Sequence, residues 1–104
     1  MAEVKDYLYR LRPVRAGMLA EGPTEAEERT LAAHFAYLQE LTDRGVVLLA
    51  GRTLATGPET FGLVVFRAAD EAGARSLMAG DPAVRDGVMT AELFPFRVAL
   101  RARE

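Results

Sequence analysis

The sequence of 104 residues contains no cysteine and only one histidine, His34. Without cysteine, disulfides, thiolate zinc sites, iron–sulfur clusters and cysteine nucleophiles are all excluded. A single histidine cannot build a histidine-rich metal site either. These absences direct attention to acid–base chemistry by the remaining polar side chains.

Long apolar runs are also lacking. No stretch approaches the roughly 20 residues that a membrane helix needs, and residues 1–6 lack the basic start and apolar run of a signal peptide. We therefore expect a cytoplasmic protein without a membrane partner. Thirteen basic and fifteen acidic residues give a formal net charge of -2, which provides no broad positive field for binding phosphates. Nucleic acid is thus not an expected partner.

What the sequence does contain fits one folded domain. Half of the residues are hydrophobic and 27% are charged, a balance typical of a globular protein with a soluble surface. The length leaves room for one core, so we predict a single domain over residues 1–104. A domain of this size buries only about 60–65% of the surface of its unfolded chain, and a dimer interface would add to its stability.

The first third of the chain predicts a strand, a loop and a long helix. The aromatic-rich run Tyr7–Arg12 is typical of a strand, and a long loop follows over Pro13–Pro23. Thr24 and Glu27 have the spacing of a capping box, which predicts a helix start at this point. Gly45 provides the left-handed stop of that helix. Its apolar positions recur at steps of three and four residues and form one stripe: Leu31, Phe35, Leu38 and Leu41.

The next segment predicts two strands and a second helix. Short apolar runs at Val46–Ala50 and Leu63–Phe66 are separated by glycine and proline, as in a hairpin-like connection. Asp70 is a cap for a helix through about Ala79. Three side chains of this helix are available for packing: Ala72, Leu77 and Met78.

Asp81-Pro82 begins one further short turn, because aspartate is a good N-cap and proline fits the first helical position. Gly87 ends the turn, and a final strand is expected over about Met89–Leu100. The resulting order is βαββαβ, the ferredoxin-like α+β arrangement with two helices on one face of a four-stranded antiparallel sheet.

The opposite face of that sheet is expected to lack a cover. Apolar side chains on it would expose more apolar area than soluble monomers usually tolerate. We therefore predict a homodimer that forms through the open sheet face. The side chains expected there are Leu8, Val65, Phe94 and Phe96.

His34 is a candidate general acid or base. It lies three residues after Leu31 and four before Leu38, and therefore beside the apolar stripe. Imidazole is the only side chain whose unperturbed charge change falls near neutral pH. A structural histidine that binds a backbone carbonyl would fit the same position, so both interpretations stay open.

Asp81 also has two interpretations. Asp-Pro before a turn is a common helix cap that needs no further function. In the predicted topology, however, the end of the second helix and the middle of the first lie on the same side of the sheet. Asp81 can then orient the imidazole of His34 and stabilise its cation, as in a general acid–base dyad.

At these residues the chain resembles a known family, the YciI-like (YCII-related) proteins, over about Tyr7 to Leu100. The resemblance implies a ferredoxin-like fold assembled as a dimeric α+β barrel, with His34 and Asp81 as an active-site pair near the dimer interface. Some relatives are taken to be lyases that act by acid–base elimination, and the substrate does not transfer. The matching segments are His34-Phe35-Ala36-Tyr37-Leu38, Leu41, Gly45, Leu49-Ala50-Gly51, Phe61-Gly62-Leu63, Asp81-Pro82-Ala83-Val84, Gly87-Val88 and Glu92-Leu93-Phe94-Pro95-Phe96.

Four further residues are candidates for binding a substrate. Arg12 and Arg15 lie at the loop after the first strand, and a guanidinium can hold a carboxylate or phenolate by paired hydrogen bonds. A solvated loop charge is the alternative. Tyr9 and Tyr37 can supply a phenolic hydrogen bond near the dyad, or simply pack with a hydrated hydroxyl.

The leading hypothesis is a cofactor-independent enzyme. In it, neutral His34 removes a proton from a small, aromatic or enolic organic acid while Asp81 holds the ring, giving a lyase-like elimination or an isomerisation. The alternative is a non-catalytic protein that binds a small ligand or serves as an accessory subunit.

RNA and haem are disfavoured as ligands. RNA-recognition domains share the βαββαβ order, and Thr60–Phe66 partly matches their aromatic strand motif, but Glu59 and Leu63 replace the basic and stacking residues. Haem binding through a histidine occurs in some dimeric α+β barrels, yet no other feature of the sequence favours it.

Overall fold

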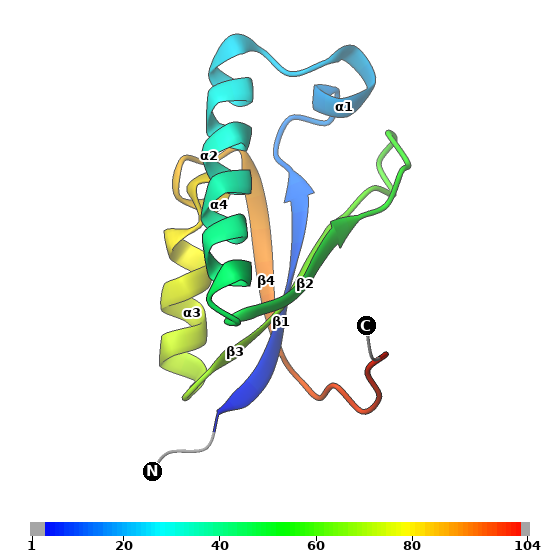
Figure 1. Cartoon of the computed structure of the whole chain (residues 1–104). Coiled ribbons are helices and arrows are strands. Elements are labelled where there is room, and N and C mark those ends of the chain that lie inside the picture. The colour runs from blue at the N-terminus through cyan, green and yellow to red at the C-terminus, as the bar shows by residue number, and fades with distance from the viewer. Residues whose placement is uncertain (1–3, 103–104) are drawn as a thin grey trace.

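The computed structural model describes residues 4–102. Residues 1–3 and 103–104 lie outside this range. The predicted domain, 1–104, and the segment without signal-peptide character, 1–6, are therefore described only in part. Within residues 4–102, four strands and four helices follow one another, and Figure 1 labels them. They are β1 (Lys5–Pro13), α1 (Met18–Glu21), α2 (Glu25–Asp43), β2 (Val47–Arg52), β3 (Gly62–Ala68), α3 (Glu71–Gly80), α4 (Pro82–Arg85) and β4 (Met89–Phe96). Within residues 4–102, none of the helices combines the length and apolar character needed to span a bilayer.

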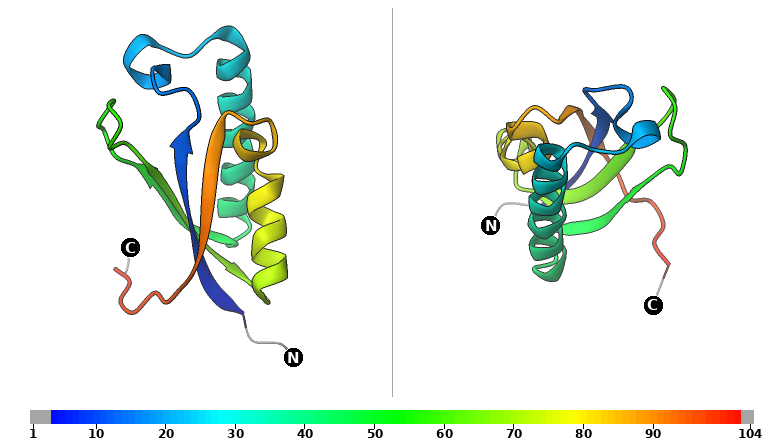
Figure 2. Two further views of the ribbon diagram at one scale, coloured as in Figure 1. Left: turned by 180° about the vertical axis from the view of Figure 1, so that it is seen from behind. Right: turned by 90° about the horizontal axis from the view of Figure 1, so that it is seen from above.

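The strands form one antiparallel sheet in the order β2-β3-β1-β4. Helices α2, α3 and α4 lie on one face of this sheet, as the two turned views show (Figure 2). The predicted α+β fold with βαββαβ order is therefore confirmed. β1 and β3 are the central strands of the sheet.

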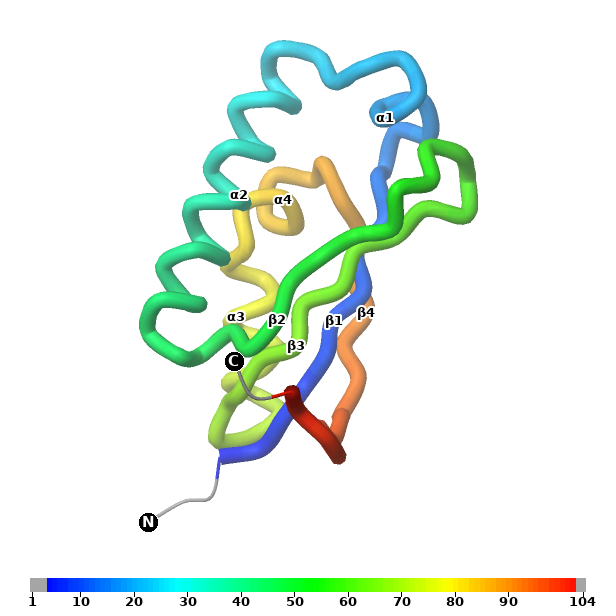
Figure 3. Tube along the Cα trace, turned by 45° about the vertical axis from the view of Figure 1, so that its right-hand side comes forward, coloured from blue at the N-terminus to red at the C-terminus, as the bar shows by residue number. Residues whose placement is uncertain are grey.

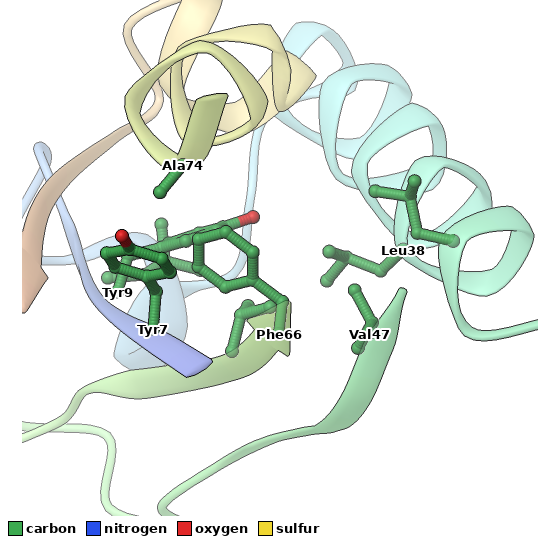
Figure 4. Close-up of a cluster of buried hydrophobic side chains, with 9 residues drawn as sticks. Tyr7, Tyr9, Leu38, Val47, Phe66 and Ala74 are labelled. Atoms are coloured by element: carbon green, nitrogen blue, oxygen red, sulfur yellow. The ribbon is translucent and has the colours of Figure 1, made fainter. Parts of the chain in front are cut away.

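The helix-covered face holds the core. Successive side chains of β1 alternate between the two faces, which places Tyr7, Tyr9 and Leu11 under the helices, where all three are buried. Tyr9 meets Phe66 of β3 edge to face, with ring centroids 5.5 Å apart. Leu38, Val47 and Ala74 close the cluster from the neighbouring elements (Figure 4). The core thus packs around the ring of Tyr9.

Helix α2 begins where the sequence predicts. The hydroxyl of Thr24 accepts the backbone N–H of Glu27, and the carboxylate of Glu27 accepts the backbone N–H of Thr24. Gly45, with φ of +76°, follows the helix end in the left-handed conformation.

Phe35 departs from the predicted stripe of α2, because it is 68% exposed while Leu38 and Leu41 are buried. At about 100° per residue, His34 lies within roughly 40° of both leucines on the helical wheel, whereas Phe35 lies about 120° from Leu41. His34 therefore lies on the side of α2 that faces the core, and Phe35 lies at the edge of that side.

Other differences from the predictions concern element ends and one short helix. The final strand ends at Phe96 and not near Leu100. In the second long helix Ala72 is exposed and Ala74 is the buried alanine. The segment predicted as loop contains α1, whose Met18 is fully buried. Burial of this side chain stabilises a helical turn that the proline- and glycine-containing sequence does not suggest.

Candidate functional site

The site is centred on Asp81, which joins α3 to α4. Its side chain is fully buried, and one carboxylate oxygen, Oδ1, accepts the backbone N–H of Ala83 at 3.0 Å. The predicted cap with proline at the first helical position is therefore present. The other oxygen, Oδ2, accepts the hydroxyl of Tyr9 at 2.8 Å. Backbone and side-chain donors together fix the plane of the carboxylate.

His34 meets the same carboxylate from α2. Its Nδ1 lies 2.7 Å from Oδ1 of Asp81, and its side chain is 15% exposed. An ionised carboxylate only accepts hydrogen bonds, so the ring nitrogen that faces it carries the proton. In the neutral ring, Nε2 then keeps its lone pair. The arrangement is that of an oriented imidazole with one basic nitrogen turned away from its carboxylate partner.

Tyr9 acts on Asp81 from the sheet. It is fully buried on β1, and its pKa lies far above the ordinary value, first because of burial and then because of the negative charge of Asp81. Tyr9 is therefore a neutral hydroxyl donor to the carboxylate. Alternation along β1 brings it to the helix-covered face, and this places a strand side chain beside the cap of α4, 72 residues away.

Tyr37 contacts α3 instead. Its hydroxyl donates to the backbone oxygen of Leu77 at 2.7 Å. Burial, followed by the charge of Asp81, raises the pKa of Tyr37. A Cβ on Gly80 would lie 3.1 Å from this hydroxyl, so the absence of a side chain at Gly80 leaves room for Tyr37. The hydrogen bond ties α2 to the end of α3, just before Asp81.

A cavity of about 720 Å³ lies on the other side of His34. It is bounded by α2, by the segment that contains α1, and by β2 and β3 with their connection. Figure 3 traces the course of these segments along the backbone. Much of its wall is apolar, including Met18, Phe35, Leu38 and Phe61. His34 thus lies between the buried carboxylate and a space large enough for a small organic molecule.

The structure does not bring Arg12 or Arg15 to this cavity. Arg15 forms a paired hydrogen bond with Glu27, with Nε to Oε2 at 3.0 Å and a terminal nitrogen to Oε1 at 2.8 Å. Arg12 follows the buried Leu11 on β1, so its side chain leaves toward the opposite face. Their substrate-binding roles, and those of Tyr9 and Tyr37, stay predictions. Arg15 has a structural partner that the sequence analysis did not anticipate.

The polar residues that line the cavity include Arg52 and Thr60, neither of which the sequence indicated as a site residue. Arg52 is the last residue of β2, where it pairs with Gly62 of β3, and Thr60 lies in the connection between the two strands. Within residues 4–102, no three histidine, aspartate or glutamate side chains gather in a way that could hold a metal ion.

Fold and site together define an α+β protein of the ferredoxin-like class, with a buried histidine–aspartate pair beside a cavity under its long helix. The model of the YCII-related domain matches residues 10–97. The chain therefore belongs to the YCII-related domain family, as the resemblance in its sequence implied.

Two solved structures share the fold. The 5-chloro-2-hydroxyhydroquinone dehydrochlorinase TftG from Burkholderia phenoliruptrix AC1100, in complex with 2,5-dihydroxybenzoquinone, is 21% identical, with a TM-score of 0.63 over 88% of this chain and 93% of that one. The protein NE2512 of unknown function from Nitrosomonas europaea is 18% identical, with a TM-score of 0.52 over 100% of both chains. A search of curated proteins finds no match to the chain.

Proposed function

We propose that this protein is a cofactor-independent acid–base enzyme that acts on a small aromatic or enolic organic acid. One observation carries the proposal: His34 lines the cavity while its Nδ1 lies 2.7 Å from the fully buried carboxylate of Asp81. A histidine that served only packing would have no need of an oriented, buried anion behind it. Asp81 and His34 are the proposed catalytic pair.

In the proposed reaction, Nε2 of His34 takes a proton from a substrate carbon. The electron pair of the broken C–H bond forms a double bond, and in an elimination the leaving group departs with its own bonding pair. In an isomerisation the imidazolium returns the proton to another carbon. Asp81 stabilises the imidazolium and holds the ring, while Tyr9 and Ala83 hold Asp81 in turn.

The apolar wall of the cavity supports a small, largely apolar substrate. The structure of TftG offers a compatible example, because that protein is a dehydrochlorinase in complex with a dihydroxybenzoquinone. At 21% identity the likeness shows the fold, and the step from that activity to this chain is an analogy. A ring of this size fits a cavity of about 720 Å³.

The test is turnover by purified protein. Chloride release from 5-chloro-2-hydroxyhydroquinone, and loss of carbon-bound protons from a panel of small enolic and aromatic acids in deuterium oxide, would detect elimination and proton transfer. Asp81→Asn is expected to lower kcat by roughly 10³- to 10⁴-fold, because the imidazole loses its orienting anion. Asp70→Asn is the matched control: Asp70 caps α3 through Gly73 N–H but lies at an exposed position. Full activity in His34→Ala would contradict the proposal.

The alternative function, a non-catalytic ligand-binding or accessory protein, predicts a different result. A ligand would bind in the cavity with measurable affinity, yet neither chloride release nor proton exchange would depend on His34.

We also propose that the protein forms a homodimer through the open sheet face. Leu49, Val65, Leu8 and Phe94 pair in one row across all four strands. Leu49 is 65% exposed and Phe94 40% exposed, so the row presents apolar surface that a second copy would cover. A single domain over residues 1–104 and a cytoplasmic location remain predictions.

A further inference from the structure

The end of the cavity near the β2–β3 connection carries a positive charge. Arg52 is the last residue of β2 and pairs with Gly62, which pairs in turn with Leu11. Paired residues of antiparallel strands point to the same face, and Leu11 is buried under the helices. The side chain of Arg52 therefore leaves the sheet on the cavity side. A Cβ on Gly62 would lie 3.8 Å from the Cβ atoms of both neighbours, so no side chain separates Arg52 from Leu11.

A buried hydroxyl lies at the same end. Thr60 is only 6% exposed and lines the cavity. Its Oγ1 is 3.2 Å from Oγ1 of Thr53, which also accepts the backbone N–H of Phe61 at 3.4 Å. Because Oγ1 of Thr53 already accepts from Phe61, the Thr53 hydroxyl can donate its own proton to Oγ1 of Thr60, and the hydroxyl proton of Thr60 is then available to another acceptor. A ligand oxygen in the cavity would satisfy it.

The charge of Arg52 has no acidic partner within residues 4–102. Its only hydrogen bond there joins a terminal nitrogen to the backbone oxygen of Thr53 at 3.3 Å. Among the cavity-lining residues of that part of the chain, Arg52 is the single lysine or arginine, and Asp43 is the single carboxylate. Asp43 ends α2, shortly before Val47 begins β2. Arg52 lies five residues beyond Val47, which is about 16 Å along the strand from Val47. The cavity therefore has a cationic end and an anionic end.

We propose that Arg52 and Thr60 bind the ionised oxygen of an anionic ring substrate, whose reacting carbon faces Nε2 of His34. This assignment rests on the proposed function and narrows it: the substrate class is a phenolate, an enolate or a carboxylate attached to a small ring. A planar guanidinium pairs two N–H groups with such oxygens. Phe35 and Phe61 provide apolar surface for the ring. Arg52 takes the role that the sequence analysis assigned to Arg12 and Arg15.

Calorimetric titration at pH 7 tests the assignment with two related probes. 2,5-Dihydroxybenzoquinone is a vinylogous acid and is therefore anionic, whereas 2,5-dimethoxybenzoquinone has the same ring without an acidic hydroxyl. Arg52→Gln is expected to raise the Kd of the anion by about 10- to 100-fold, because a hydrogen bond to a charged group is lost. Arg52→Lys should recover part of this loss. The Kd of the neutral quinone should change little. Arg75→Gln on α3 is the control, because Arg75 is also an exposed arginine but does not line the cavity.

The outcomes separate this assignment from the proposed enzyme activity. Equal binding of the anion by wild-type protein and Arg52→Gln, or no preference of the wild-type protein for the anion, would overturn the assignment and leave the His34 tests unaffected. If anion binding depended on Arg52 but no turnover depended on His34, the result would support the anion site and contradict the proposed enzyme activity. With an active substrate, Arg52→Gln is expected to raise KM more than it lowers kcat, whereas Asp81→Asn should act on kcat.

Discussion

The same four strands make both faces of the sheet, yet the two faces differ in whether their buried polar atoms have hydrogen-bond partners. On the helix-covered face, the carboxylate of Asp81 is fully buried and has hydrogen bonds from Tyr9 and Ala83 as well as the contact with His34. On the open face, Nε of Arg10 is buried with no hydrogen-bond partner within residues 4–102. The buried carboxylate on the helix-covered face thus has its partners within a single chain, whereas the open face has a buried nitrogen without one.

Apolar side chains show the same contrast. Phe66 is fully buried beneath the helices, while Phe94 is 40% exposed on the open face, with the guanidinium carbon of Arg10 5.8 Å from its ring centre. The helices and the His34–Asp81 pair thus lie on the face whose aromatic core is already buried within one chain. The open face is the one where a partner can still add stability, so substitutions on the two faces should differ in both size and concentration dependence.

The largest effect is expected from the core. Phe66→Ala removes a ring that packs against both Tyr7 and Tyr9, and it should lower the free energy of unfolding by about 3–5 kcal/mol. Phe94→Ala should cost less than half as much in the monomer. Urea denaturation at several protein concentrations distinguishes the two variants. Only the loss of unfolding free energy in Phe94→Ala should grow with protein concentration. Equal losses at every concentration would abolish the distinction between the faces.

The next effect concerns the open face alone. Leu49→Glu places a charge in the apolar row across the sheet and should weaken the dimer by roughly 100-fold in Kd, since a charge would be buried in its interface. Leu54→Glu, at an 87% exposed position in the β2–β3 connection, is the matched control. Light scattering after size exclusion measures both. A wild-type protein that is monomeric at all concentrations would show that the open face has no second copy on it.

A smaller effect tests the polar part of the helix-covered face. Tyr9→Phe removes the hydroxyl donor to the buried carboxylate of Asp81 and should cost about 1–3 kcal/mol of unfolding free energy. Tyr7→Phe is the control, because the hydroxyl of Tyr7 has no hydrogen bond within residues 4–102. With a substrate, kcat should fall in Tyr9→Phe and not in Tyr7→Phe. Similar stabilities of the two variants would show that Tyr9 does not hold Asp81.

The sequence predicted the features that depend on local chemistry. The capping box at Thr24 and the Asp81-Pro82 cap involve residues two or three apart, so their spacing alone indicates the structure. The approach of His34 to Asp81 followed from the topology and the family resemblance. All of these contacts are present in the structure.

Features that depend on distant packing were missed. Arg15 was interpreted as a ligand for substrate because its partner, Glu27, is brought to it only when the intervening segment folds. Arg52 was overlooked because its direction depends on strand pairing with Gly62. The bond from Tyr9 to Asp81 joins residues 72 apart, and no local pattern indicates it.

The smallest effect tests the edge of the helix-covered face, where Arg15 attaches the segment around α1 to α2. Hydrogen bonds from Arg15 and from Thr24 lower the pKa of Glu27 to about 2. Because this folded-state pKa lies below the unfolded value of about 4.5, the pair stabilises the fold above about pH 4.5, and this contribution is lost as the pH falls toward 2. Glu27→Gln should therefore lower the Tm at pH 7 and have a progressively smaller effect as the pH falls to 3.

Glu28→Gln removes the neighbouring exposed carboxylate of the same helical turn, which makes no ion pair within residues 4–102, and is the matched control. Its Tm difference from the wild-type protein should be small at both pH values. Thermal melts of the three proteins at pH 7 and pH 3 make the comparison. If Glu27→Gln and Glu28→Gln behaved alike, Arg15 would be free to leave Glu27, and its predicted role in binding an anionic substrate would again compete with that of Arg52.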